Sequence, residues 1–146
     1  MKEQIDKVSK FSMEIMEQSL KMEHVKKHAA VKKEISPQCT VYEYPMTNSE
    51  MNLAVAEITH RYPDSGYAIN HKSSEMGYVL KGSGKLVTET HSVSLSAGDV
   101  VYIPRGEKYY WDGAITVVLP ATPAWHPEQH AVLSGVPKSG TTEVGV

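Results

Sequence analysis

From Ser36 onward the chain reads as a succession of short β-strands, and this pattern constrains its fold more than any other feature. The stretches are rich in Val, Ile, Tyr and Thr, and turn residues such as those of 63–66 and 82–84 separate them. They are TVYEYPM (40–46), MNLAVAEITHRY (51–62), EMGYVLKG (75–82), GKLVTET (84–90), VSLSAGDVVYIP (93–104) and AITVVLPA (114–121). Because no helical segment interrupts them, they predict an all-β antiparallel sandwich or barrel.

The first 34 residues have a different texture, without Gly or Pro and with apolar residues at helical spacing. This spacing predicts one or two helices lying against the barrel or a neighbouring subunit, with a short coiled coil or a mobile arm as alternatives. Pro37 ends the segment, because the residue before a proline is driven out of the helical region. The last residues carry Gly, Ser and Thr with little apolar pattern. We therefore expect a helical extension over 1–35, a β-domain over 36–133 and a flexible tail over 134–146.

Size and charge limit the partners of this chain. At 146 residues it suits one domain with its own core. The net charge of −2 gives no basic field for nucleic acid or anionic lipid, so we expect neither partner. Cys39 is the only cysteine, which excludes an intrachain disulfide and fits a reducing compartment. With no apolar run near the N-terminus, we expect no secretory signal and a cytoplasmic protein.

Two stretches carry residues suited to chemistry. In residues 66–82, His71 and Glu75 lie four apart across a predicted turn between strands, a spacing that predicts both side chains in one cavity. In residues 98–109, a strand broken by Pro-x-Gly ends at Tyr109, a potential phenolic ligand.

A third stretch, residues 123–130, contains Trp125, His126 and His130. The two histidines have the i, i+4 spacing of one helical face, but Pro127 lies between them, so a surface-loop position and a pocket or metal-binding role both stay open. Trp125 suits packing at the barrel mouth, with ligand stacking as the alternative.

The first two stretches resemble the two motifs of the cupin superfamily. The matching positions are Gly66, His71, Glu75 and Gly82 in the first motif and Gly98, Pro104 and Gly106 in the second. The resemblance covers about residues 50–120. It implies an antiparallel cupin (jelly-roll) β-barrel carrying the N-terminal α-helical extension, a pocket for a small-molecule ligand, and a homodimer.

The sequence departs from the family at two metal positions. Ile69 and Tyr109 stand where the family has histidines of a three-His, one-Glu set that holds a divalent metal. What the resemblance leaves is His71, Glu75 and Tyr109. Three protein ligands are enough in number to hold a divalent first-row metal (Fe, Mn, Ni or Zn). The phenol of Tyr109, however, must lose its proton before it can coordinate a metal. A metal centre and a metal-free pocket therefore both stay open.

Three functions fit these residues. The first is a metal-dependent enzyme, an isomerase, lyase or similar, acting on a small polar metabolite in the barrel. A metal held by His71, Glu75 and Tyr109 would polarise a carbonyl or carboxylate oxygen while Tyr109 or His71 moves a proton. The second is a metal-free ligand-binding or sensory protein without catalysis. The third is an accessory protein that assembles with others through its helix and barrel.

Overall fold

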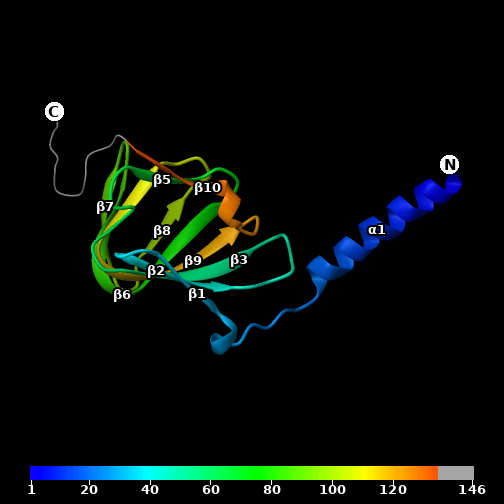
Figure 1. Cartoon of the computed structure of the whole chain (residues 1–146), viewed down its shortest axis with the longest axis horizontal. Coiled ribbons are helices and arrows are strands. Elements are labelled where there is room, and N and C mark those ends of the chain that lie inside the picture. Colours follow the sequence, from blue (N-terminus) through cyan, green and yellow to red (C-terminus); the bar gives the residue numbers. More distant parts are fainter. Residues whose placement is uncertain (135–146) are drawn as a thin grey trace.

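The computed structural model describes residues 1–134, so the predicted tail, apart from Ser134, lies outside the described residues. One helix precedes a series of strands (Figure 1). The helical elements are α1 (Lys2–Leu20) and the 3₁₀ turns η1 (Lys27–Ala29) and η2 (Pro127–Gln129). The strands are β1 (Val31–Ser36), β2 (Cys39–Tyr44), β3 (Asn52–Ile58), β4 (Arg61–Tyr62), β5 (Tyr67–Asn70), β6 (Ser74–Thr88), β7 (Ser92–Ser96), β8 (Val100–Ile103), β9 (Tyr109–Thr122) and β10 (His130–Leu133).

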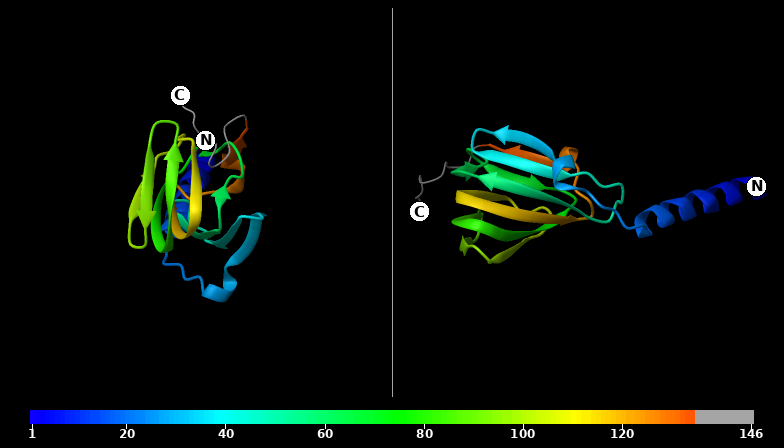
Figure 2. Two further views of the ribbon diagram at one scale, coloured as in Figure 1. Left: turned by 90° about the vertical axis from the view of Figure 1, so that its left-hand side faces the viewer. Right: turned by 90° about the horizontal axis from the view of Figure 1, so that it is seen from below.

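All the strand pairs are antiparallel, and the strands form one curled sheet (Figure 2). The main path runs β1-β2-β3-β9-β5-β10, while β6 pairs with β7, β8 and β9. The long strands β6 and β9 pair along most of their length and form the backbone of this half-barrel. The predicted all-β antiparallel architecture with an N-terminal helix is confirmed.

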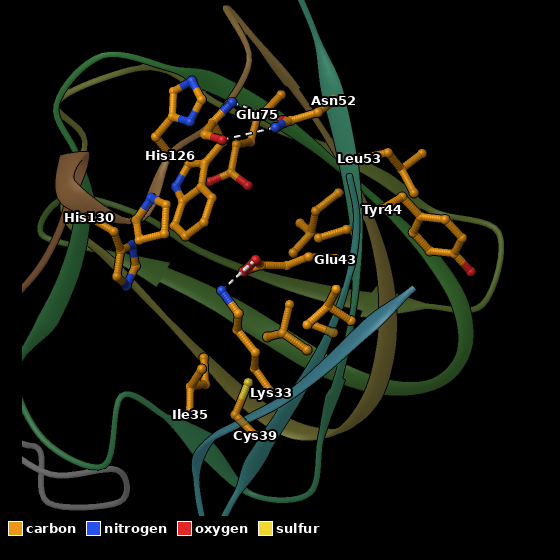
Figure 3. Close-up of a pocket in the computed structure, with 18 of the residues that line it drawn as sticks. Lys33, Ile35, Cys39, Glu43, Tyr44, Asn52, Leu53, Glu75, His126 and His130 are labelled. Atoms are coloured by element: carbon orange, nitrogen blue, oxygen red, sulfur yellow. Dashed lines mark hydrogen bonds and ion pairs between the residues drawn. The ribbon is translucent and has the colours of Figure 1, made fainter. Parts of the chain in front are cut away.

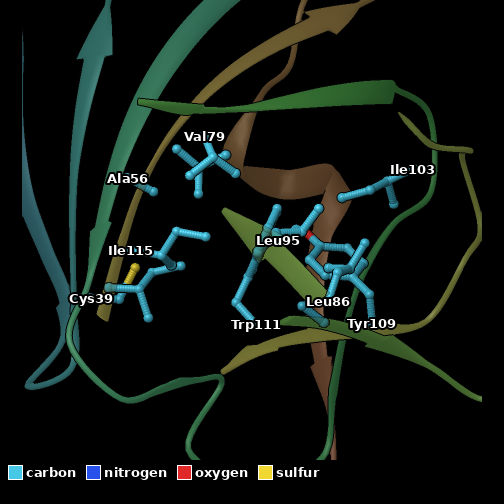
Figure 4. Close-up of a cluster of buried hydrophobic side chains, with 12 residues drawn as sticks. Cys39, Ala56, Val79, Leu86, Leu95, Ile103, Tyr109, Trp111 and Ile115 are labelled. Carbon is cyan, nitrogen blue, oxygen red and sulfur yellow. The ribbon is translucent and has the colours of Figure 1, made fainter. Parts of the chain in front are cut away.

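The concave side of the sheet holds the core. Strand residues alternate between the two faces of a sheet, and the alternation of buried and exposed residues is clear in the first part of β6, up to Val79. Figure 4 shows this cluster. Its buried members are Cys39, Ala56, Ile58, Ala68, Val79, Leu86, Leu95, Ile103, Tyr109, Trp111, Ile115 and Val117. The packed cluster fixes the curvature of the sheet and leaves a cavity at one end of the concave side.

Two of the motif glycines are required by backbone geometry. Gly66 and Gly82 have φ of +76° and +83°, a region that side chains with a Cβ rarely adopt. A Cβ on Gly66 would collide with the carbonyl oxygen of Leu133, and one on Gly82 with that of Ala114. These glycines let β5 lie close to β10 and β6 lie close to β9.

The helix is shorter than the sequence periodicity predicts. It ends at Leu20, and Val31 begins the first strand, before the predicted boundary at residue 36. Glu23 explains part of the difference, since its carboxylate accepts hydrogen bonds from the backbone and side chains of Thr47 and Asn48. These bonds, led by the Thr47 backbone N–H, lower the pKa of Glu23 to about 2.

The N-terminal helix α1 stands clear of the sheet in Figure 1 and in the right view of Figure 2. Its apolar side chains Ile5, Val8 and Phe11 are exposed. Nowhere in residues 1–134 is there a helix long and apolar enough to cross a membrane.

Candidate functional site

A cavity of about 530 Å³ opens on the concave side of the sheet. Its walls come mainly from β1, β2, β3 and β9, with the segment 125–130 at one end. Most of the lining is apolar, and Figure 3 shows Glu75 and His130 pointing into a space that the Lys33–Glu43 pair also borders. A cavity of this size with few polar groups is typical of a small-molecule site.

Glu75 is the buried acid of this cavity. It lies near the start of β6 and is only 9% exposed. Burial raises its pKa to about 7, although a hydrogen bond that Asn70 Nδ2 donates to its carboxylate acts in the opposite direction. Near neutral pH this carboxyl is therefore present in both protonation states.

The orientation of the Asn70 amide follows from its neighbours. The indole N–H of Trp125 can only donate, and it lies 2.7 Å from Asn70 Oδ1. The oxygen of the amide therefore faces Trp125, which turns Nδ2 toward Glu75. Asn70 is 3% exposed, so no solvent rearrangement competes with this arrangement. The buried acid has a fixed hydrogen-bond donor.

The same amide oxygen determines the tautomer of His130. His130 Nδ1 lies 3.3 Å from Asn70 Oδ1, which can only accept, so Nδ1 carries the proton. Nε2 then accepts from the hydroxyl of Tyr62, 3.0 Å away. Burial lowers the pKa of His130, which keeps the imidazole neutral. Glu75, Asn70, His130 and Tyr62 form one hydrogen-bonded chain along the cavity.

Tyr109, the first residue of β9, lines the cavity and is 5% exposed. Among the described side chains and backbone groups, none forms a hydrogen bond with its hydroxyl, which leaves that hydroxyl for a ligand. Burial and the nearby Glu75 raise its pKa well above the ordinary value for a phenol. Tyr109 therefore stays protonated and is able to donate a hydrogen bond.

The β1–β2 hairpin carries the charged part of the cavity wall. Lys33 Nζ and Glu43 Oε2 form an ion pair of 2.9 Å. Its neighbours Val31 and Ile35 lie on the same side of β1 and are 47% and 45% exposed. The cavity is thus more open along β1 than at the end that holds Glu75.

Of the residues predicted from the sequence, the structure brings Glu75 and Tyr109 into the cavity and leaves His71 outside it. His71 is exposed and does not line the cavity. Side chains alternate along an extended segment, so the inward position falls to its neighbour Asn70. The His71 backbone N–H donates to Gln129 O, which fixes the turn. The expected meeting of His71 and Glu75 in one cavity is therefore not found.

The donor groups of the cavity do not fit a divalent metal. In the part of the chain that the structure describes, no three His, Cys, Asp or Glu side chains come together as ligands. Both ring nitrogens of His130 already have hydrogen-bond partners, and Tyr109 would have to lose a proton that its surroundings hold tightly. The metal-ligand set of His71, Glu75 and Tyr109 stays a prediction. Of these three residues, Glu75 and Tyr109 line the cavity.

Sequence reasoning missed Asn70 and left the histidines of the third stretch undecided. Pro127 begins the single turn η2 instead of a longer helix, and the chain then enters β10. In β10, His130 pairs with Asn70 of β5, which brings its ring to the cavity. His126 also lines the cavity. The spacing of the residues gave no sign of the β5–β10 pairing.

Comparisons with known proteins agree on the kind of fold. Residues 59–119 match the family model described as Cupin domain. A curated relative, 1-hydroxy-2-naphthoate 1,2-dioxygenase from Nocardioides sp. (strain KP7), is 32% identical over 84 residues, which are 49% of this chain and 22% of that protein. This chain thus matches under a quarter of the relative's length.

Two solved structures show the likeness in three dimensions. Pac13, described as a nucleoside dehydratase from Streptomyces, has a TM-score of 0.71 at 15% identity, covering 82% of this chain and 98% of that one. An RmlC-like cupin from Shewanella frigidimarina has a TM-score of 0.58 at 18% identity, covering 70% and 93%. At these identities the likeness concerns the fold alone.

Proposed function

This chain carries a cupin domain, and from that premise we propose that it is an isomerase or lyase that binds a small polar metabolite in its cavity. Glu75 exchanges a proton with the bound molecule, and Tyr109 donates a hydrogen bond to it. The observation that carries the proposal is the pair of buried groups in one cavity. The Glu75 carboxyl has a pKa of about 7, and the Tyr109 hydroxyl has no hydrogen-bond partner among the described residues.

The arrangement suits general acid–base catalysis. A base works best when its pKa lies near the operating pH, and burial brings Glu75 to that range. Its carboxylate takes a proton from a carbon next to a carbonyl group, while the Tyr109 hydroxyl donates to the carbonyl oxygen on which charge develops. In an isomerisation Glu75 returns the proton to another carbon. In an elimination the proton is passed to the departing group.

The relatives give support of a general kind. The Streptomyces protein is described as a nucleoside dehydratase, and structures of its variants with His→Gln or Tyr→Phe substitutions are described with uridine. A dehydration is an elimination, the reaction class proposed for this chain. Another solved structure of the same fold, from Ruegeria pomeroyi, is described as a DMSP lyase, with a TM-score of 0.59.

No step of this proposal passes through a metal. The family resemblance implies Fe, Mn, Ni or Zn, but the donor groups around Glu75 fit such an ion poorly. We also propose a cytoplasmic location, because one buried thiol, Cys39, suits a reducing compartment. A homodimer is the expected assembly.

A non-catalytic ligand-binding protein is the second candidate. The apolar lining favours it, since an apolar pocket with a few polar anchors is typical of a binding site without turnover. In that case Glu75 and Tyr109 only orient the ligand.

One experiment separates the two candidates. Wild-type protein and a Glu75→Gln variant are incubated with a small-metabolite extract, with and without EDTA, and the extract is followed by mass spectrometry. We expect the wild type to consume at least one compound in both conditions. Glu75→Gln, which keeps the shape but cannot accept a proton, should slow this consumption at least about a hundredfold.

His71→Ala is the matched control, because His71 lies close in sequence but outside the cavity. It should behave as the wild type. A loss of turnover in His71→Ala equal to that in Glu75→Gln would contradict the site described here. A compound that is retained by the wild type and never converted would identify the binding protein instead.

A further inference from the structure

The convex side of the sheet exposes an unusual number of large apolar side chains. On β6, Met76, Tyr78 and Leu80 are 52%, 44% and 54% exposed. On the neighbouring strand β8, Val100 and Tyr102 are 58% and 60% exposed. Scattered apolar residues are normal on a surface, but a contiguous group of this kind marks an interaction site.

Strand register shows that this group extends across five strands. One row of paired residues consists of Tyr42, Val55, Val118, Tyr78 and Val100. Beside it lie the paired sets Tyr44–Leu53–Pro120 and Met76–Tyr102. None of these ten residues is charged. At about 4.8 Å between strands, the rows are about 19 Å wide. We call these ten residues the outer face.

Most of the outer face points away from the cavity, and only Tyr44 and Leu53, at its edge, also border the cavity. The residues between its members, such as Ala56 and Val117, are buried on the concave side. In Figure 3, Tyr44 and Leu53 lie on the far side of their strands from Glu75. The helix α1 stands clear of the sheet, so it does not cover this surface within the chain (Figure 1).

Charged residues border the outer face: on β1, Lys32 pairs with Tyr42 and Glu34 with Thr40, and two opposite charges stand on the two sides of β9. In the next row along the strands, Glu57 of β3 and Lys81 of β6 both pair with Thr116 of β9, one from each side. Neither belongs to an ion pair among the described side chains, and Glu57 forms a side-chain hydrogen bond with Tyr42. Consider a two-fold axis that lies in the interface and runs parallel to β9. Rotation about it leaves each residue at the same position along the strand direction, but moves a residue from one side of β9 to the other side. It therefore places Glu57 opposite Lys81 of a second copy, twice.

We propose that the outer face binds the outer face of a second copy of this chain, about a two-fold axis parallel to β9. The uncharged rows form the dry centre, as in homodimer interfaces, and the two Glu57–Lys81 contacts border it. This inference gives the expected homodimer a surface. It is independent of the proposed catalysis, because Glu75 and Tyr109 are buried on the cavity side of the sheet and do not belong to the outer face.

The mass of the full-length chain in sedimentation equilibrium tests the proposal. We expect a dimer for the wild type and a monomer for Tyr78→Glu and for Val100→Glu, which place charges in the centre of the interface. Val132→Glu on β10, a residue 51% exposed outside the outer face, is the matched control and should remain dimeric.

Charge exchange tests the axis itself. Glu57→Lys and Lys81→Glu each create like-charge contacts and should raise the dimer Kd at least about tenfold. The double variant restores opposite charges and should restore the wild-type Kd. Failure of the double variant to recover would overturn the proposed axis.

Two further results would overturn the interface. One is a wild type that stays monomeric at every concentration tested. The other is a dimer that persists in both outer-face variants but dissociates in Val8→Glu, which would move the contact to α1. Metabolite consumption measured on the same variants keeps a failed interface distinct from a failed site.

Discussion

At the scale of single residues, the cavity is organised by Asn70. Its Oδ1 accepts hydrogen bonds from the Trp125 indole N–H and from His130 Nδ1–H, and its Nδ2 donates one to the Glu75 carboxylate. A buried carboxyl without such a donor would have a pKa further above its ordinary range, since burial disfavours the charged form. One amide thus holds the acid at a pKa near neutrality and keeps His130 in one tautomer.

The raised pKa of Glu75 predicts a pH-dependent stability. The folded-state pKa of about 7 exceeds the ordinary value of 4.5, so the folded protein binds one proton more than the unfolded chain between these values. Stability should therefore fall as pH rises from 4.5 to 7 and level off above. The loss is up to about 3 kcal/mol, from 1.36 kcal/mol per pKa unit. Urea denaturation across this pH range measures it.

Glu75→Gln is the comparison for that measurement, because Gln stays neutral at every pH. Its stability should lack the decline of the wild type, while contributions from other groups, such as Glu23, remain in both proteins. Equal pH dependence in the two proteins would show that Glu75 titrates at an ordinary pKa.

At the scale of elements, the close pairing of β6 and β9 holds the barrel in shape. Gly82 permits this pairing, because its positive φ and the carbonyl oxygen of Ala114 leave no room for a side chain. Gly98, in the turn between β7 and β8, has a φ of +94° but open space where a Cβ would stand. Glycine is thus required at position 82 by both its positive φ and the lack of space, and at position 98 by its positive φ alone.

This difference makes a testable pair of variants. Gly98→Ala should lower the free energy of unfolding by about 1 kcal/mol, the cost of a positive φ alone. Gly82→Ala adds a collision with the backbone of β9 and should cost at least about 3 kcal/mol. Equal losses for the two variants, measured by chemical denaturation, would mean that the backbone at Gly82 moves without cost.

At the scale of the whole molecule, the site depends on strands from both ends of the sheet. The β1–β2 hairpin supplies Lys33 and Glu43, and β10 supplies His130. Between them, β6 and β9 contribute Glu75 and Tyr109. The cavity therefore exists only when the sheet is fully curled.

The metal content of the purified protein tests whether His71, Glu75 and Tyr109 hold a metal ion. We expect the purified protein to hold Fe, Mn, Ni and Zn at well below one equivalent per chain, even after growth in supplemented medium, because the cavity gathers too few ligands. Elemental analysis measures this. Near-stoichiometric metal that disappears in His71→Ala would restore the set of His71, Glu75 and Tyr109.

The sequence by itself determined the fold class. Alternating apolar residues, turn residues and glycines at fixed spacing are local signals, and they predicted the antiparallel barrel and placed Glu75 and Tyr109 in its pocket region. It did not determine where the helix ends, because Glu23 is held by Thr47 and Asn48, more than 20 residues away in the chain. Only tertiary structure decided that Asn70, and not His71, faces the cavity beside His130. That choice follows from the pairing of β5 with β10, a contact between segments 60 residues apart that leaves no periodic trace in the sequence.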